Sequence, residues 1–323
     1  MTRGGTRRGA LAVPDLVARA RTGDPAAVAR LITLVEDASP SLREVMSALR
    51  EHAGRAHVLG ITGAPGVGKS TSTSALVSAM RRDGRRVGVL AIDPSSPFSG
   101  GALLGDRVRM GDHALDRDVY IRSMGARGHL GGLAWSTPQA VRVLEAAGCD
   151  VVVVETVGVG QSEVEVAGLA DTTLVLLAPG MGDGIQAAKA GILEIGDLYA
   201  VNKADRDGAD RTQRELRTML TMGERREGVW RPPVVKTVAT TGEGVDELLG
   251  EIDRHAAWLE ESGDLVRRRT ARARREVEAI ALATLRERWG HAGDGEDLHA
   301  LAGRVAAGEL DPYTAADELL GDP

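Results

Sequence analysis

The stretch GAPGVGKS, Gly63 to Ser70, decides the fold predicted for this chain of 323 residues. It matches the pattern G-x-x-x-x-G-K-[ST], directly follows the apolar run HVLGI and directly precedes the helical pattern TSTSALVSAMRR. Glycines let backbone N–H groups turn toward phosphate oxygens, and a helix that begins at this point adds the positive end of its dipole. Because the motif has the strand and the helix that it requires, it predicts a phosphate-binding loop.

Lys69 and Ser70 have separate expected roles in this loop. Lys69 is one of four lysines among 40 basic residues, and its ammonium is expected to reach the β and γ phosphates and to act in catalysis. Ser70 is expected to ligate magnesium. The other residues predicted to bind the nucleotide at this loop are Gly63, Ala64, Pro65, Gly66, Val67, Gly68 and Thr71.

Apolar runs alternate with helical patterns along most of the chain. Four successive valines, Val151 to Val154, are typical of a strand that helices cover on both faces. The alternation predicts an α/β fold of the P-loop NTPase class, with a mostly parallel central sheet flanked by helices. The runs expected to form the sheet are AHVLGITG, RRVGVLAID, VYIRSM, DVVVVET, TTLVLLAPG, DLYAVNKAD and PVVKTVATT.

Helical patterns without strands occupy both ends of the chain. We expect an N-terminal helical arm over residues 1–55, in which Asp24 caps a helix that begins at Pro25. The P-loop domain is expected over residues 56–258. A C-terminal helical region is expected over residues 259–323, and its apolar stripes need a partner.

The segment NKAD, Asn202 to Asp205, follows the apolar run LYAV and predicts selection of a guanine base. The carboxylate of Asp205 can accept hydrogen bonds from guanine N1–H and from its 2-amino group, whereas adenine offers neither donor there. Asn202 is the only asparagine of the chain, and Lys203 is another of the scarce lysines. The segment TVATTGEG is expected to form the remaining base-side loop, with Val238, Ala239 and Thr240 near the guanine.

Several carboxylates are expected near the phosphate loop. Glu155 ends the valine strand and begins ETVG, where small GTPases carry a D-x-x-G pattern, so Glu155 is expected to hold magnesium and Gly158 to offer its N–H to the γ-phosphate. Asp93 ends the run VGVLAI and is expected at the same edge of the sheet. Asp106 precedes a helical pattern and is a further candidate magnesium ligand.

Composition limits the classes of function. The net charge of −6 and an aromatic content of 2% argue against a nucleic-acid binder, and no run reaches the roughly 20 apolar residues of a membrane span. A cytoplasmic protein is expected, and the arginine-bearing start MTRGGTRRGALAVPDLV leaves organelle targeting as an alternative. The run RRRTARARR, Arg267 to Arg275, is interpreted as the solvated or interface side of a helix rather than a polyanion site.

Together, these segments resemble the MeaB/ArgK-type G proteins, the GTPase family that includes the methylmalonic aciduria type A protein. The resemblance rests on GAPGVGKST, DPSSPFSGGALLGDRVRM, ETVGVGQSE, PGMGDGIQAAKAGILEIGD and NKAD, and it extends over nearly the whole chain. It implies a homodimeric, Mg²⁺-dependent GTPase that acts as a chaperone of an adenosylcobalamin-dependent acyl-CoA mutase, most often methylmalonyl-CoA mutase. Such a chaperone controls the loading and the protection of the cofactor.

The resemblance also implies roles for particular residues. Asp93, Asp106 and Glu155 would serve the magnesium ion and the switches, and the C-terminal helices would supply the dimer contact. A third switch, which responds to the nucleotide and contacts the mutase, would correspond to GMGDGIQAAKA, with Asp183, Gln186 and Lys189. Without the resemblance, that stretch is a glycine-rich loop that runs into a helix, and Lys189 is a surface charge.

Two other functions are compatible with a P-loop protein of this kind. A metal-insertion GTPase of the nickel-enzyme maturation type needs a cluster of Cys or His, and the sequence has one Cys and seven scattered His. A nucleotide-dependent kinase of a transport protein needs ATP, which Asp205 argues against.

Overall fold

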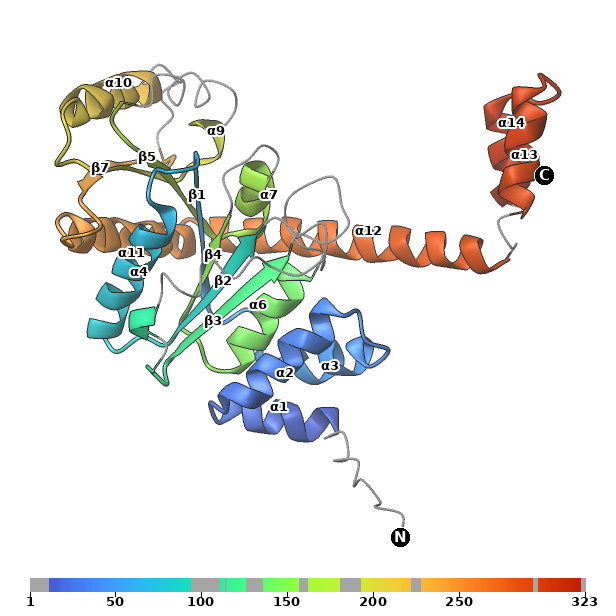
Figure 1. The fold of residues 1–323 in the computed structure, drawn as a ribbon, viewed down its shortest axis with the longest axis horizontal. Coiled ribbons are helices and arrows are strands. Elements are labelled where there is room, and N and C mark those ends of the chain that lie inside the picture. Colours follow the sequence, from blue (N-terminus) through green and yellow to red (C-terminus); the bar gives the residue numbers. More distant parts are fainter. Residues whose placement is uncertain are drawn as a thin grey trace, which may run out of the picture. The chain divides into compact units, whose positions relative to one another are not determined.

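A computed structural model describes residues 12–93, 111–113, 115–125, 136–156, 162–180, 193–221, 228–292 and 296–320. Its described strands form one seven-stranded sheet in the order β3-β2-β4-β1-β5-β6-β7, in which every neighbouring pair is parallel (Figure 1). The predicted α/β fold with a parallel central sheet is therefore confirmed. The strands are β1 (His57–Gly63), β2 (Val87–Asp93), β3 (Val119–Gly125), β4 (Val151–Glu155), β5 (Thr172–Leu177), β6 (Leu198–Asn202) and β7 (Val234–Thr237).

The valine strand β4 shows how helices cover both faces of the sheet. Val152 and Val154 pack in the same core as α6 (Thr137–Ala146) and α7 (Ser162–Leu169), while Val151 and Val153 pack with α4 (Lys69–Arg82) and α11 (Val245–Glu261). Burying each of these side chains stabilises the fold by about 1.5–3 kcal/mol. A third core joins α10 (Ala209–Thr221) to β5, β6 and β7. The strand ends are therefore held on rigid elements.

The N-terminal arm shares a hydrophobic core with the sheet. It consists of α1 (Val13–Arg21), α2 (Pro25–Glu36) and α3 (Leu42–Leu49), followed by the short helix η1 (Arg50–His52), and it packs with α6. The Asp24 carboxylate accepts from the backbone N–H groups of Ala26 and Ala27, which confirms the predicted cap. Arg122 of β3 pairs with Glu36 at the end of α2.

The chain divides into two compact units, residues 1–268 and residues 269–323. The long helix α12 (Asp264–Ala292) begins in the first unit, and the second unit also contains α13 (Glu296–Ala306) and α14 (Pro312–Leu320), which pack on each other. The helical character predicted for the C-terminal region is confirmed. No helix among the described residues combines the length and the apolar character that crossing a membrane demands.

The first turn of α12 is attached to the amino edge of the sheet by one arginine. Arg268 donates two hydrogen bonds to the Asp197 carboxylate, at 2.8 and 2.9 Å, and one to Asp264 at 3.0 Å. It also donates to the backbone carbonyl of Asp171 at 3.1 Å. The run Arg267–Arg275 therefore belongs to a helix, as expected, but Arg268 is half-buried and forms a bidentate pair with a buried carboxylate.

A buried histidine lies beside this arginine. His255 of α11 has no exposed surface, and its Nδ1 is 2.7 Å from the hydroxyl of Thr172. Burial lowers the pKa of His255 to about 4, which keeps the ring neutral at pH 7. Trp230 and Trp258 pack against the His255 ring, with centroids at 4.6 and 5.7 Å. The amino edge of the sheet thus serves packing and attachment.

Candidate nucleotide-binding site

The phosphate loop connects the carboxyl end of β1 to the start of α4. Lys69 is buried, and its Nζ donates to the carbonyl oxygens of Gly63 at 2.8 Å and of Ala64 at 3.2 Å, so the loop curves around the ammonium group. Val67 fastens the loop to the core, whereas Pro65 and Gly66 at its tip are exposed. The arrangement brings a cation, loop N–H groups and a helix N-terminus together, which suits a phosphate chain.

Two glycines of this loop occupy positions where an added side chain would collide with a neighbouring residue. Gly63 has φ +142°, and a Cβ added there would lie 2.3 Å from the carbonyl oxygen of Leu176 on β5. Gly68 has φ +96°, and its added Cβ would lie 2.5 Å from the side-chain nitrogen of Asn202. The loop can therefore approach β5 and the NKAD segment only without side chains at these points.

Asn202 joins the phosphate loop to the base-side loop. It is buried at the carboxyl end of β6, and its Nδ2 donates to the carbonyl of Val67 at 2.8 Å. Its Oδ1 accepts from the backbone N–H of Ala239 at 3.1 Å and from the hydroxyl of Thr237 at 3.3 Å. One amide group thus links two loops that are far apart in the sequence.

The rest of the NKAD segment continues this link. Lys203 has φ +58°, which is unusual for a residue with a side chain, and its Nζ donates to the carbonyl of Gly66 at 2.6 Å. Asp205, two residues after Lys203, is exposed, so its carboxylate is open to a ligand. Val238 is buried and forms an isolated antiparallel bridge with Glu243, which fixes the backbone turn next to Ala239, while Thr240 is exposed.

Glu155 lies beside the first turn of α4. Its Oε1 accepts from the Ser70 hydroxyl at 2.6 Å, and its Oε2 accepts from the Thr73 hydroxyl at 2.8 Å. Glu155 is 4% exposed and Ser70 8%. The sequence motifs pointed to Ser70 and Glu155 but not to Thr73, which lies beyond the phosphate-loop pattern. A helical spacing of three residues from Ser70 is the only signal that could have found it.

The other residues predicted for the site are placed in part or not at all. Asp93 is the last residue of β2, the strand paired with β4, so its backbone lies at the same edge of the sheet as Glu155. Its side chain is outside the described part of the structure. The remaining residues that lie outside the described ranges are Asp106, Gly158, Asp183, Gln186 and Lys189.

A phosphate-loop motif and an NKAD segment that meet at the carboxyl edge of a parallel sheet are typical of GTP-hydrolysing P-loop proteins. The protein-family model described as methylmalonyl-CoA mutase-associated GTPase MeaB matches residues 28–294 of this chain. The chain belongs to this family.

Individual relatives agree with this assignment. A Pyrococcus horikoshii protein whose name describes it as a GTPase is 47% identical over 311 residues, which cover 95% of this chain and 97% of that protein. The mouse mitochondrial methylmalonic aciduria type A homolog is 36% identical over 316 residues, covering 92% and 76% of the two chains. A crystal structure named LAO/AO transport system kinase superposes with a TM-score of 0.72 at 28% identity and covers 96% of each chain. The chain is a GTPase.

The close approach of Gly68 to Asn202 predicts the effect of adding one methyl group. Gly68→Ala should lower the free energy of unfolding of the nucleotide-free protein by about 2–4 kcal/mol, because a left-handed backbone and a displaced Asn202 amide each cost free energy. Gly66→Ala is the matched control: Gly66 has φ +80°, but an added Cβ meets nothing within 4 Å. It should lose only about 1–2 kcal/mol.

Urea unfolding followed by tryptophan fluorescence measures both changes. Equal losses for the two variants would show that the contact between Gly68 and Asn202 does not matter.

Proposed function

We propose that the site at the carboxyl edge of the sheet binds GTP with Mg²⁺ and hydrolyses it, and that hydrolysis times the action of the protein on an adenosylcobalamin-dependent acyl-CoA mutase. The observation that supports the site most directly is the Asn202 amide, which ties the phosphate loop to the base-side loop. In this proposal, the backbone of residues 63–71 binds the phosphates, and Lys69 stabilises the charge that shifts onto them during phosphoryl transfer.

The residues beside the phosphate loop suit a magnesium ion. Ser70 and Glu155 offer a hydroxyl and a carboxylate oxygen, the hard donors that Mg²⁺ prefers, and they lie at a helix N-terminus where the phosphates would arrive. We assign Asp93 and Asp106 to the same ion. When bound, the ion neutralises charge on the phosphate oxygens, while Gly158 offers its N–H to the γ-phosphate.

Base selection is proposed to rest on Asp205. Its carboxylate is exposed next to the buried Asn202, and Val238, Ala239 and Thr240 form the opposing loop. Two donors on the guanine edge match the two oxygens of this carboxylate, and adenine has neither donor. The relative named as a transport system kinase leaves the alternative of kinase activity open, and that activity would require a different base preference.

Asp205→Asn should reverse the nucleotide preference. Because an amide cannot accept both guanine hydrogen bonds, GTP binding should weaken by about 1–3 kcal/mol, whereas xanthosine triphosphate should bind better than GTP. Calorimetric titration of wild type and variant with GTP, ATP and xanthosine triphosphate provides the measurement. Unchanged GTP affinity in the variant would overturn the assignment of Asp205.

The mutase as partner is supported by the family to which the chain belongs. The matching family model is described as a mutase-associated GTPase, and the mouse relative is named for methylmalonic aciduria. We assign the coupling to the segment GMGDGIQAAKA, with Asp183, Gln186 and Lys189, because it follows β5 in the sequence, and β5 ends at the edge of the sheet where the nucleotide site is proposed. In this role the protein admits intact cofactor to the mutase and removes damaged cofactor.

Lys189→Ala should separate intrinsic hydrolysis from stimulated hydrolysis. If the mutase and the nucleotide bias one two-state segment, basal GTP turnover persists while acceleration by methylmalonyl-CoA mutase is lost. Lys236→Ala is the control, since this scarce lysine lies on β7 and pairs with Asp210 at the surface, and it should leave the acceleration intact. The measurement is phosphate release with and without the mutase, and equal acceleration of all three proteins contradicts the role of Lys189.

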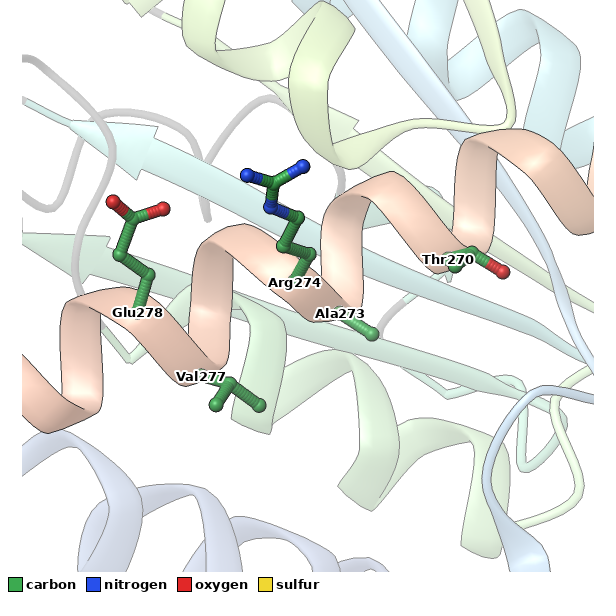
Figure 2. Close-up of a pocket in the computed structure, with 5 residues that line it drawn as sticks. All are labelled: Thr270, Ala273, Arg274, Val277 and Glu278. Carbon is green, nitrogen blue, oxygen red and sulfur yellow. The ribbon is translucent and has the colours of Figure 1, made fainter.

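A homodimer formed through the C-terminal helices is also part of the proposal. Along α12, Ala273, Val277 and Ile280 are exposed and recur at the spacing of one helical stripe. Figure 2 shows residues that line a hollow along this helix: the side chains of Ala273 and Val277 lie on one side, and those of Arg274 and Glu278 point to the other. All residues of this hollow come from α12 alone. A second copy of the helix would bury the apolar stripe and leave the charges at its rim.

The stripe predicts which substitutions break the dimer. The double variant Val277→Glu/Ile280→Glu should be monomeric, because both charges would be buried in the contact. Leu282→Glu is the control: Leu282 is 50% exposed on the same helix but lies about 200° around the helix from Ile280. Light scattering of the full chain after size-exclusion chromatography measures the mass. A double variant that remains dimeric places the interface elsewhere.

A further inference from the structure

Thr73 donates one of the hydrogen bonds that hold the Glu155 carboxylate. It lies on α4 three residues after Ser70, and its side chain has no exposed surface. Its hydroxyl donates to Oε2 of Glu155 at 2.8 Å, while the Ser70 hydroxyl donates to Oε1 at 2.6 Å. Two hydroxyls on one face of the helix therefore donate hydrogen bonds to the two oxygens of one carboxylate.

The hydrogen bond of Thr73 differs from those of three other hydroxyls in the described helices. Thr33, Ser78 and Thr218 each donate to the backbone carbonyl four residues earlier, at 2.9 to 3.0 Å. This local bond is the usual one for a serine or threonine inside a helix. A hydroxyl has a single proton to donate, and Thr73 directs its proton across to β4. The side chain therefore links α4 to Glu155 instead of supporting its own helix.

The backbone around Glu155 is already held by the sheet. Glu155 is the last residue of β4, and the N–H of Thr156 donates to the carbonyl of Ile61 on β1 at 3.1 Å. The Thr156 hydroxyl also donates to the hydroxyl of Thr62 at 3.1 Å. What the sheet leaves undetermined is the rotation of the three side-chain bonds of the glutamate. Thr73 restricts this rotation at the far end of the side chain.

We propose that Thr73 is a positioning residue for magnesium: it fixes Oε2 of Glu155 so that Oε1 faces the ion beside Ser70. This inference rests on the proposed magnesium site. Ser70 cannot serve the same purpose alone, because it is itself a proposed ligand of the ion. Thr73 donates from a fully buried position one turn further into the helix, so its bond is independent of the ligand that enters the loop.

The loss of this hydroxyl has a defined chemical consequence. A hydroxyl that donates to a carboxylate forms one of the stronger hydrogen bonds in proteins, and here both partners are buried. Without it, Oε2 keeps its charge but loses the Thr73 donor, and the rotation of the carboxylate is less restricted. The affinity for Mg²⁺ should therefore fall, whereas contacts between the phosphate loop and the nucleotide should be unaffected.

Three variants separate positioning from packing. Thr73→Val removes the hydroxyl and keeps the shape, and Thr73→Ser restores the hydroxyl without the methyl group. Ser72→Ala is the matched control, because Ser72 is a neighbouring buried residue whose hydroxyl has no hydrogen-bond partner among the described residues. The affinity for GDP is measured by calorimetry in EDTA and across a range of Mg²⁺ concentrations. Thermal unfolding confirms that each variant is folded.

The proposal predicts a split between the two conditions. In Thr73→Val, the Mg²⁺ concentration that gives half of the effect on GDP binding should rise about tenfold or more, as expected for a lost hydrogen bond to a charged group. GDP affinity in EDTA should stay within about twofold of wild type, because no phosphate contact is removed. Thr73→Ser should restore most of the Mg²⁺ response, and Ser72→Ala should match wild type.

The results that would contradict the role of Thr73 differ from those that would contradict the magnesium site. An unchanged Mg²⁺ response in folded Thr73→Val overturns the proposal and leaves the magnesium site intact. An equal loss of GDP affinity with and without Mg²⁺ also overturns it, since that pattern indicates packing. If wild-type GDP binding does not respond to Mg²⁺ at all, or if Glu155→Gln responds like wild type, the magnesium site itself is wrong and the role of Thr73 is wrong with it.

Discussion

The hydrogen bonds of one buried amide, that of Asn202, hold the candidate nucleotide site together. Its nitrogen binds the phosphate loop and its oxygen binds the loop after β7, so three segments that follow β1, β6 and β7 share one polar group. A buried amide that lost these partners would cost about 1–3 kcal/mol. The loops are therefore stable together and unstable apart, which pre-organises the site before any ligand arrives.

The same requirement explains several other choices of residue. Gly68 must lack a side chain because the Asn202 amide occupies the space beside it, and Lys203 adopts a left-handed backbone while its ammonium reaches the loop tip. Strain of this kind persists only where the surroundings determine the conformation. Here the parallel register of β5, β6 and β7 fixes the conformation, because it fixes the point at which each strand ends and its loop begins.

The sequence predicted the parts of this protein that depend on local pattern. The runs of apolar residues identified each described strand of the sheet, the Asp24-Pro25 pair identified the start of α2, and the phosphate loop was recognisable from glycine spacing. Contacts that depend on tertiary geometry could not be predicted. In the sequence, Thr73 is one of several polar residues in a helical pattern, and Arg268 lies in a run of arginines that is typical of a solvated helix face. Only the folded structure brings Glu155 next to Thr73 and Asp197 next to Arg268.

The two edges of the sheet have different physical tasks, and β6 connects them. At its amino edge Asp197 accepts the guanidinium of Arg268, and at its carboxyl edge Asn202 closes the nucleotide site. The strand between them is hydrogen-bonded on both sides and fully buried, so neither end can shift without disturbing β5 and β7. Because Arg268 lies in the first turn of α12, β6 positions both that turn and the NKAD segment. The sheet therefore positions both the first turn of α12 and the candidate nucleotide site.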